Sequence, residues 1–181
     1  MSKKQKVIVA VASIIAIGCF AYFTLFALRP LLYFIGVTSP KLPDYEKVEK
    51  YYEENISDLE LVSTRLLEME YDNVVFDETD DGSIMFDFTI NNRWDRSLCD
   101  DLELSKSIER LYHNNISPIK KYNGKFIIFI CQSSMTETRG IVYSGSGELP
   151  NLEGIIELKE LSNSNWYYYV NSYEKWQMLN K

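Results

Sequence analysis

The chain has 181 residues, a length typical of one compact domain, and 46% of them are hydrophobic, which is enough for a packed core. This composition is not that of a disordered chain, a collagen or a disulfide scaffold. The net charge is −7, but the first 28 residues contain three lysines and no acid, so the rest of the chain holds 16 basic and 26 acidic residues. Because such an acidic domain repels phosphate groups, no nucleic-acid partner is expected.

Residues 7–28 are uncharged, and twelve of these 22 residues are Val, Ile, Leu or Phe. A helix of this length spans about 33 Å, which suffices to cross a bilayer core of about 30 Å. A cleaved signal peptide has a shorter apolar region, of about 7–15 residues, and then a small-x-small site, which is missing at the end of this run. The segment Ala16–Cys19 resembles a degenerate lipoprotein signal, but the residues after it stay mostly apolar. We therefore predict an uncleaved transmembrane anchor over 7–28.

The charges around this anchor predict its orientation. Three lysines precede it, which favours a cytoplasmic position for residues 1–6 and a position outside the cell for the C-terminal part. The stretch 29–43 is interpreted as an interfacial segment and linker, so membrane lipid is expected to contact residues 7–37. The remaining residues, 44–181, have the length of one extracytoplasmic domain. The predicted localisation is the cell membrane, with a single pass.

The first part of this domain, Asp44–Met69, has the pattern of a helix. Its seam residues recur at alternating spacings of three and four: Tyr45, Val48, Tyr52, Asn55, Leu59, Val62, Leu66 and Met69. The seam indicates either a coiled-coil stalk or a helix packed on its own sheet, and the width of the apolar stripe favours the second. The capping-box pattern Ser57-x-x-Glu60 raises the alternative of two shorter helices.

Residues Asn73–Ile90 are predicted to form a β-hairpin, because apolar residues flank the polar segment Asp80–Gly82 and alternate after it. The Asp-Gly pair in that segment favours a tight type I′ turn, which needs positive φ angles. Ser97 is then expected to cap a second helix, whose buried stripe is formed by Leu104, Ile108 and Leu111.

Strands dominate the rest of the chain, and they are expected over 125–131, 140–143, 155–161 and 166–170. The first of these is apolar on both faces, which predicts a central place in the sheet. Asn123-Gly124 before it is expected to form a tight turn, whereas Pro118 limits the upstream arm to a sheet edge. The predicted fold class is α+β: an N-terminal transmembrane helix, then a small domain with two helices and a mainly antiparallel sheet of five to six strands.

The cysteines and the single histidine bear on catalysis. Cys99 and His113 are fourteen residues apart, and as nucleophile and base they would support a hydrolase. The competing interpretation of His113 is a contact with free carbonyl groups at a helix C-terminus. Cys99 and Cys131 are also candidates for a disulfide, which an exported domain allows, although Cys131 ends an apolar strand where a buried free thiol is usual.

Two further motifs are weak. The segment Asp77–Ile84 resembles part of a calcium loop, but Thr89 stands where the bidentate Glu is needed. Ser117-Pro118-Ile119-Lys120 matches the S-x-x-K pattern of serine–lysine enzymes, which place it at the start of a helix. Asn123-Gly124 would soon end such a helix. No metal and no cofactor is therefore predicted.

The strand 166–170 is rich in aromatic residues. Trp166 and Tyr168 lie on one face of such a strand, and Tyr167 and Tyr169 lie on the other. One pair is expected in the core, and the other pair, with Trp94 nearby, is predicted to be exposed and to bind another protein. The alternative is an aromatic ladder that only stabilises the sheet.

These patterns identify no ligand, but they favour one class of function. The leading prediction is a single-pass membrane-anchored protein whose acidic exported domain is a non-catalytic binding module, of a sensor, accessory or immunity type. The alternatives are a membrane-anchored hydrolase and an oligomer with a coiled-coil stalk.

Overall fold

The computed structural model of the protein describes residue 22 and residues 41–90 and 93–179. Residues from Leu42 onward belong to one compact unit. The predicted anchor, 7–28, lies outside the described residues except for Tyr22, and so does the adjoining stretch up to residue 40. In the part that is described, no helix is both long and apolar enough to cross a membrane.

The domain is α+β with an antiparallel sheet, as predicted, but the described residues form eight strands rather than five or six, and three helices rather than two. The sheet order is β3-β2-β1-β4-β5-β6-β8-β7. The elements in chain order are α2 (Tyr45–Glu68), β1 (Val74–Glu78), β2 (Ile84–Ile90), β3 (Arg93–Leu98), α3 (Leu102–His113), β4 (Ile119–Tyr122), β5 (Phe126–Ser133), β6 (Thr138–Ser144), β7 (Ile155–Glu160), β8 (Trp166–Asn171) and α4 (Tyr173–Leu179).

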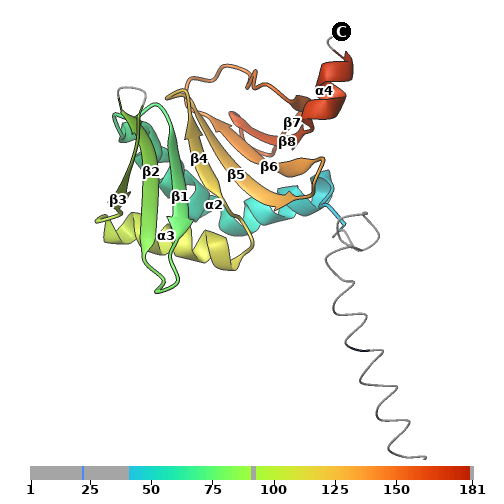
Figure 1. The fold of residues 1–181 in the computed structure, drawn as a ribbon. Helices are drawn as coiled ribbons and strands as arrows, with labels where there is room; N and C mark the ends of the chain where they lie inside the picture. Colours follow the sequence, from blue (N-terminus) through green and yellow to red (C-terminus); the bar gives the residue numbers. More distant parts are fainter. Residues whose placement is uncertain (1–21, 23–40, 91–92, 180–181) are drawn as a thin grey trace, which may run out of the picture. The chain divides into compact units, whose positions relative to one another are not determined.

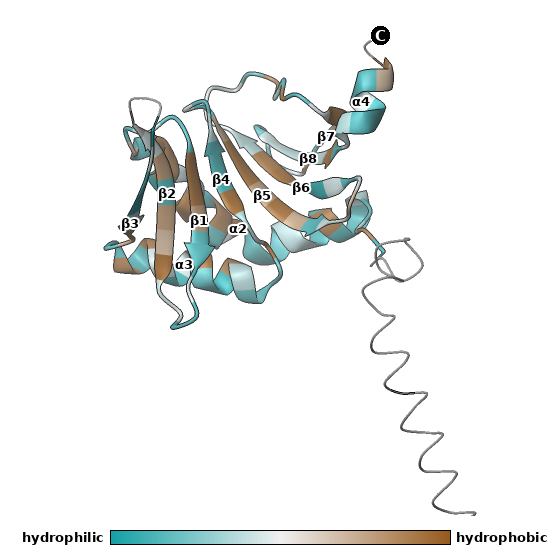
Figure 2. Ribbon diagram, viewed as in Figure 1, coloured by the Kyte–Doolittle hydropathy of each residue, from teal (hydrophilic) through white to brown (hydrophobic). Residues whose placement is uncertain are grey.

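Helices α2 and α3 cover one side of the sheet, which we call the helix face (Figure 1). The main core lies between them and the sheet. The strands contribute alternate residues to this core, and the apolar bands on β2 and β5 are visible in Figure 2. We call the other side the open face; it carries residues such as Lys120 and Ile128.

Helix α2 is one continuous helix, as the spacing predicts, so the alternative of two shorter helices is excluded. Asp44 caps its N-terminus by accepting a hydrogen bond from the backbone N–H of Lys47 at 3.1 Å. At its C-terminus, the buried Lys121 of β4 donates a hydrogen bond from Nζ to the carbonyl oxygen of Met69 at 2.7 Å. The seam from Val48 to Leu66 is buried against the sheet, so it is not free to pair with a second helix.

The two predicted tight turns have different geometries. Asn123 and Gly124 have φ angles of 51° and 68°, and Lys125 N–H donates to Tyr122, which is a type I′ hairpin turn as expected. The turn between β1 and β2 is longer, because Thr79 pairs with Ser83. Gly82 alone has a positive φ there, at 82°, so this turn is a three-residue loop and the type I′ prediction is wrong.

Two strands and one cap differ from the sequence-based expectation. Strand β3 occupies the segment that contains Ser97, and the true N-cap of α3 is Asp101, which accepts from the N–H groups of Glu103 and Leu104 at 3.0 Å. Strand β4, expected at an edge, pairs with β1 and β5 in the interior of the sheet. Pro118 lies just before β4, so it removes no hydrogen bond from the strand itself.

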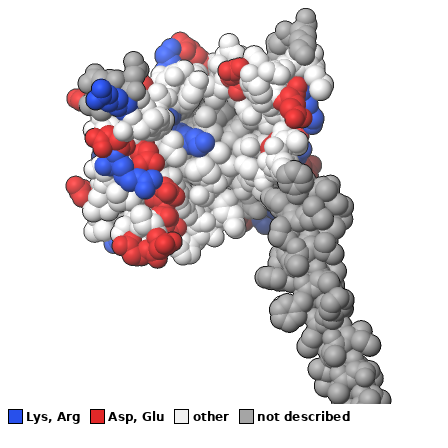
Figure 3. Space-filling view, viewed as in Figure 1, with Lys and Arg blue, Asp and Glu red and all other residues white. Residues whose placement is uncertain are grey.

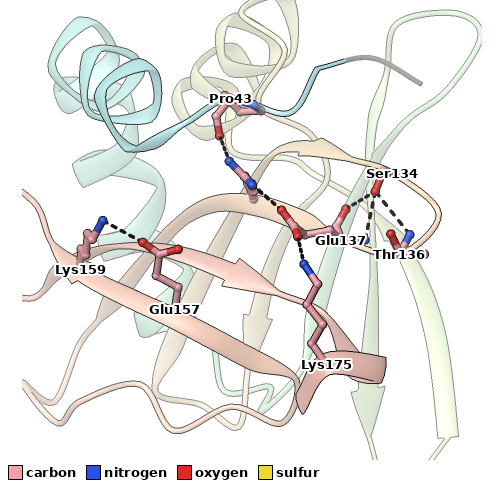
Figure 4. A network of polar contacts seen from close by, with 8 residues as sticks. Pro43, Ser134, Thr136, Glu137, Glu157, Lys159 and Lys175 are labelled. Atoms are coloured by element: carbon pink, nitrogen blue, oxygen red, sulfur yellow. Dashed lines mark hydrogen bonds and ion pairs between the residues drawn. The ribbon is translucent and has the colours of Figure 1, made fainter. Parts of the chain in front are cut away.

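Glu137, just before β6, joins three parts of the domain (Figure 4). Its carboxylate accepts hydrogen bonds from Arg139 at 2.7 Å and from Lys175 of α4 at 3.0 Å. Arg139 also donates to the carbonyl oxygen of Pro43, just before α2, at 3.1 Å. Burial by itself raises the pKa of Glu137, but the bonds from Lys175 and Arg139 outweigh it, so this pKa lies below its ordinary value.

Candidate ligand-binding site

The open face contains a cavity of about 350 Å³ over the centre of the sheet. Its floor comes from strands β4, β5, β6 and β8, and one wall comes from the segment that leads into β7. On this face the acidic and basic groups gather towards β2 and β3, and the middle is largely uncharged apart from a small basic patch (Figure 3). The cavity is lined by Lys120, Tyr122, Ile128, Ile130, Thr138, Leu152, Glu153, Tyr169 and Asn171. The volume is within the range of small-molecule sites, roughly 300–1,000 Å³.

Strand register brings these residues to one face. Lys120 is paired with Ile128, Ile128 with Val142, and Val142 with Tyr167, so the four form one row across the sheet. Because side chains alternate along a strand, Lys121 points to the helix face while its neighbour Lys120 points to the open face.

Gly140 shapes the floor of the cavity. It lies in β6 beside a bulge of β5, and a Cβ at this position would come within 2.1 Å of the carbonyl oxygen of Phe129. Any other residue would therefore push the two strands apart. Gly140 is paired with Tyr169 of β8, so no side chain stands beside Tyr169 at this position of β6.

Tyr169 is the most deeply placed polar group of the cavity. Its side chain is only 4% exposed, yet its hydroxyl makes no hydrogen bond to any described residue. The ring is buried, but the hydroxyl oxygen keeps access to the cavity: the fully buried hydroxyls without a partner among the described residues are those of Ser63 and Ser172. Burial also raises the pKa of this phenol far above its ordinary value, so the hydroxyl remains a proton donor at neutral pH.

Lys120 is the one cation of the cavity lining, and within the described residues it has neither a hydrogen-bond nor an ion-pair partner. Asp87 is the nearest acid along its row, two strands away across Val75, but both of its carboxylate oxygens already accept hydrogen bonds from Arg96. Those bonds from Arg96 lower the pKa of Asp87, which keeps this pair ionised.

The rim opposite Lys120 is polar. Asn171 at the end of β8 donates a hydrogen bond to the carbonyl oxygen of Glu153 at 3.1 Å, which fixes the wall before β7. The Glu153 side chain itself is exposed. Thr138 contacts the Ser133 hydroxyl at 3.1 Å across the β5–β6 turn. These contacts hold the rim residues in place, and neither of them involves the apolar side chains of the cavity floor.

The predicted exposed aromatic pair is not found, because both pairs are buried. Trp166 and Tyr168 are 3% and 2% exposed and belong to the main core. Tyr167 and Tyr169 are 8% and 4% exposed on the open face. They form a second apolar cluster that is covered by side chains from the β6–β7 connection and from β7 itself: Leu152, Ile155 and Leu158. The open face is thus partly closed at this end.

Trp94 is exposed, at 62%, but it is not near the aromatic strand. It lies on β3, which is one edge of the sheet, whereas β8 is next to the opposite edge. The structure therefore separates Trp94 from Tyr167 and Tyr169, which the sequence-based hypothesis had grouped into one binding face.

Cys99 and Cys131 are free thiols, so the candidate disulfide between them is not formed. Burial raises the pKa of Cys131 to about 12 and also raises the pKa of Cys99, so neither thiol is activated as a nucleophile. Cys99 precedes α3 and His113 ends it, and a helix of this length separates them by about 18 Å. His113 Nδ1 instead contacts the carbonyl oxygen of Glu109 at 2.8 Å, as expected for a helix C-terminus.

Other candidate sites are already occupied by internal contacts. In a wider hollow of about 720 Å³ between α2 and α3, Arg110 binds Asp58 through two hydrogen bonds and Asn114 binds Asn55. Its other charged side chains, Lys106 among them, are exposed. The acidic β1–β2 turn is held together by Asp81, whose pKa is lowered to about 2 by hydrogen bonds from Thr79 and Ser83. No group of three potential metal ligands occurs among the described residues.

No protein-family model matches the chain, and no curated protein or solved structure matches it either. The cavity was not anticipated from the sequence. Lys120 belongs to the S-x-x-K pattern, and the structure places it on an extended strand, which rules out the helical turn that serine–lysine chemistry uses. Its strand, Ile119-Lys120-Lys121-Tyr122, lacks a regular alternation of polar and apolar residues, so the local sequence does not show which lysine faces the cavity.

Proposed function

We propose that this chain is a single-pass membrane protein whose exported domain is a non-catalytic binding module, and that its binding site is the open-face cavity. The observation that carries the proposal is the combination of an apolar floor with two polar groups that lack partners, Lys120 and the Tyr169 hydroxyl. A ligand that meets both groups would satisfy the hydrogen-bonding capacity that the fold leaves open.

Binding is favoured over hydrolysis by the lining of this cavity. It contains no cysteine, serine or histidine, and the hydroxyl of its threonine, Thr138, contacts the Ser133 hydroxyl rather than a base. Cys99 and His113, the pair on which the hydrolase alternative rests, lie at opposite ends of α3 and outside the cavity.

The membrane part of the proposal rests on the uncharged residues 7–28 behind three lysines. It is tested by treating intact cells with protease. A C-terminal tag should be removed while an N-terminal tag stays protected. A shorter mature form released into the medium would contradict the anchor.

The binding site is tested with the full chain in lipid nanodiscs and a set of small, water-soluble aromatic compounds. Saturation-transfer NMR, with empty nanodiscs subtracted, reports which compounds bind. Ile130→Trp should abolish binding, because Ile130 lies in the cavity floor on the central strand β5 and a larger ring would fill the hollow. Thr64→Trp is the matched control, since Thr64 is exposed on α2 and lies outside the cavity.

We expect that some compounds bind the wild type and the Thr64→Trp variant but do not bind the Ile130→Trp variant. Both variants should retain the wild-type melting curve. Compounds that bind the Ile130→Trp variant as well as they bind the wild type would place the site elsewhere, and the proposal would then be wrong.

A further inference from the structure

We infer that the ligand of the open-face cavity is a small organic anion, an apolar body that carries one carboxylate group, with Lys120 and the Tyr169 hydroxyl as its recognition groups. This inference rests on the proposed function and adds the chemical class of the ligand.

Lys120 carries a positive charge that no acidic side chain of the described residues pairs with. Most of the basic side chains on the described domain are bound to an acid, a carbonyl oxygen or an aromatic ring, and its own neighbour Lys121 is bound to Met69. Among the described basic side chains that have no partner, Lys120 is the one on an interior strand, part-buried and beside apolar residues. A partly desolvated ammonium group attracts an anion more strongly than one surrounded by water.

The second argument is the Tyr169 hydroxyl, which lines the same cavity. It has no acceptor among the described residues, and its oxygen stays accessible from the cavity although the side chain as a whole is more than nine-tenths buried. A carboxylate has two oxygens and accepts several hydrogen bonds, so one oxygen can receive the phenol proton while the other receives the ammonium group.

The third argument is the rest of the lining. Ile128, Ile130 and Leu152 provide apolar surface for an aliphatic or aromatic body. The Glu153 carboxylate stands on the rim, and β4 and the wall before β7 are separated by three strands of the sheet. A second negative group at the far end of the ligand would face Glu153, which favours a monoanion.

The test uses three probes with one aromatic body: phenylacetate, phenylacetamide and phenethylammonium. Each is titrated into the full chain in nanodiscs, and the dissociation constant is measured by ligand-observed NMR. Phenylacetate should bind about tenfold more tightly than phenylacetamide, which is the effect of one hydrogen bond to a charged group. Phenethylammonium should bind most weakly of the three.

Variants then assign the preference to Lys120. Lys120→Met should reduce the affinity for phenylacetate to that for phenylacetamide, and Lys120→Arg should retain most of the preference. Lys106→Met is the matched control, because Lys106 is an exposed lysine of α3 on the helix face and has no partner among the described residues. It should leave all three dissociation constants unchanged.

The outcomes separate this inference from the proposed function. If the acid and the amide bind equally and Ile130→Trp removes both, the cavity is a binding site but the anion preference is wrong. If phenethylammonium binds more tightly than phenylacetate, the inference is also wrong, because the charge of Glu153 would then determine which ligand binds. If none of the probes binds, or if Ile130→Trp has no effect, both the inference and the proposed function fail.

Discussion

Tyr112 and Tyr169 carry the same phenol in two different surroundings. The Tyr112 hydroxyl donates to the carbonyl oxygen of Phe76 at 2.8 Å, whereas the Tyr169 hydroxyl has no partner among the described residues. Tyr112→Phe should lower the free energy of unfolding by about 0.5–1.5 kcal/mol, because a buried acceptor loses its donor. Tyr169→Phe should leave it nearly unchanged, because the lost hydroxyl makes no hydrogen bond to a described residue and its oxygen is accessible from the cavity.

Urea unfolding of the two variants, followed by tryptophan fluorescence, measures this difference. A loss of more than about 1 kcal/mol in Tyr169→Phe would mean that its hydroxyl is bonded inside the fold. The hydroxyl would then already have an acceptor in the fold and would not be available as a donor to a ligand.

The stability of the domain in acid depends on the ionised Glu137 carboxylate and its two basic partners. Its pKa lies below the ordinary value of 4.5, so its bonds to Arg139 and Lys175 contribute stability above that pH and lose it as the pH falls through the lowered pKa. Glu137→Gln should lower the free energy of unfolding at pH 7 by about 1–3 kcal/mol, and the difference from wild type should vanish in acid.

Thermal melts between pH 7 and pH 3 measure this convergence. The control is Glu148→Gln, because Glu148 forms an exposed pair with Lys125 and such pairs are worth about 0–1 kcal/mol. A Glu137→Gln deficit that stays constant across the pH range would show that packing, and not charge, holds this junction together.

At the scale of elements, two residues before α3 are candidates for its N-cap. Asp101 accepts two backbone hydrogen bonds at the N-terminus of α3, whereas Ser97 lies within strand β3. Asp101→Ala should therefore cost about 0.5–2 kcal/mol, and Ser97→Ala should cost much less. Chemical unfolding of both variants measures the contrast, and a larger loss for Ser97→Ala would contradict the assigned boundary.

The local sequence does not distinguish the two candidate N-caps. Both sites offer a short polar side chain before the apolar stripe of α3, and residues 93–98 lack the apolar alternation that marks a strand. Nearly every residue of β3 is exposed. In the described part of the chain it is an edge strand, so β2 is its one neighbour in the sheet. Its pairing with β2 is a tertiary property, and local patterning does not predict it.

At the scale of the whole molecule, the seam of α2 belongs to the core of its own domain. Leu59 is fully buried there, so Leu59→Asp should place an unpaired charge in the core and cost at least about 4 kcal/mol. We expect the 42–181 fragment to be a soluble monomer that this substitution unfolds.

Sedimentation and circular dichroism of the fragment distinguish the two uses of the seam. A stalk would give a wild-type dimer that becomes a folded monomer in the Leu59→Asp variant. The buried seam predicts a wild-type monomer and an unfolded variant.

The sequence by itself determined the elements whose pattern is strong and local. The period of α2, the two-sided apolar run of β5 and the positive φ angles of Asn123-Gly124 each follow from nearby residues, and the structure confirms them. The α+β class with an antiparallel sheet follows from the order of these elements. The charge balance and the uncharged run 7–28 are likewise properties of the sequence alone.

Only the tertiary structure decided which residues form the candidate site. Tyr167 and Tyr169 are buried because the β6–β7 connection and β7 pack over the open face, and contacts between such distant segments leave no local pattern. Lys120 and Tyr169 are brought to one cavity by the sheet order, which places β4, β5, β6 and β8 side by side. A polar group becomes informative when the fold places it beside apolar side chains without a protein partner, and that condition depends on every neighbouring strand.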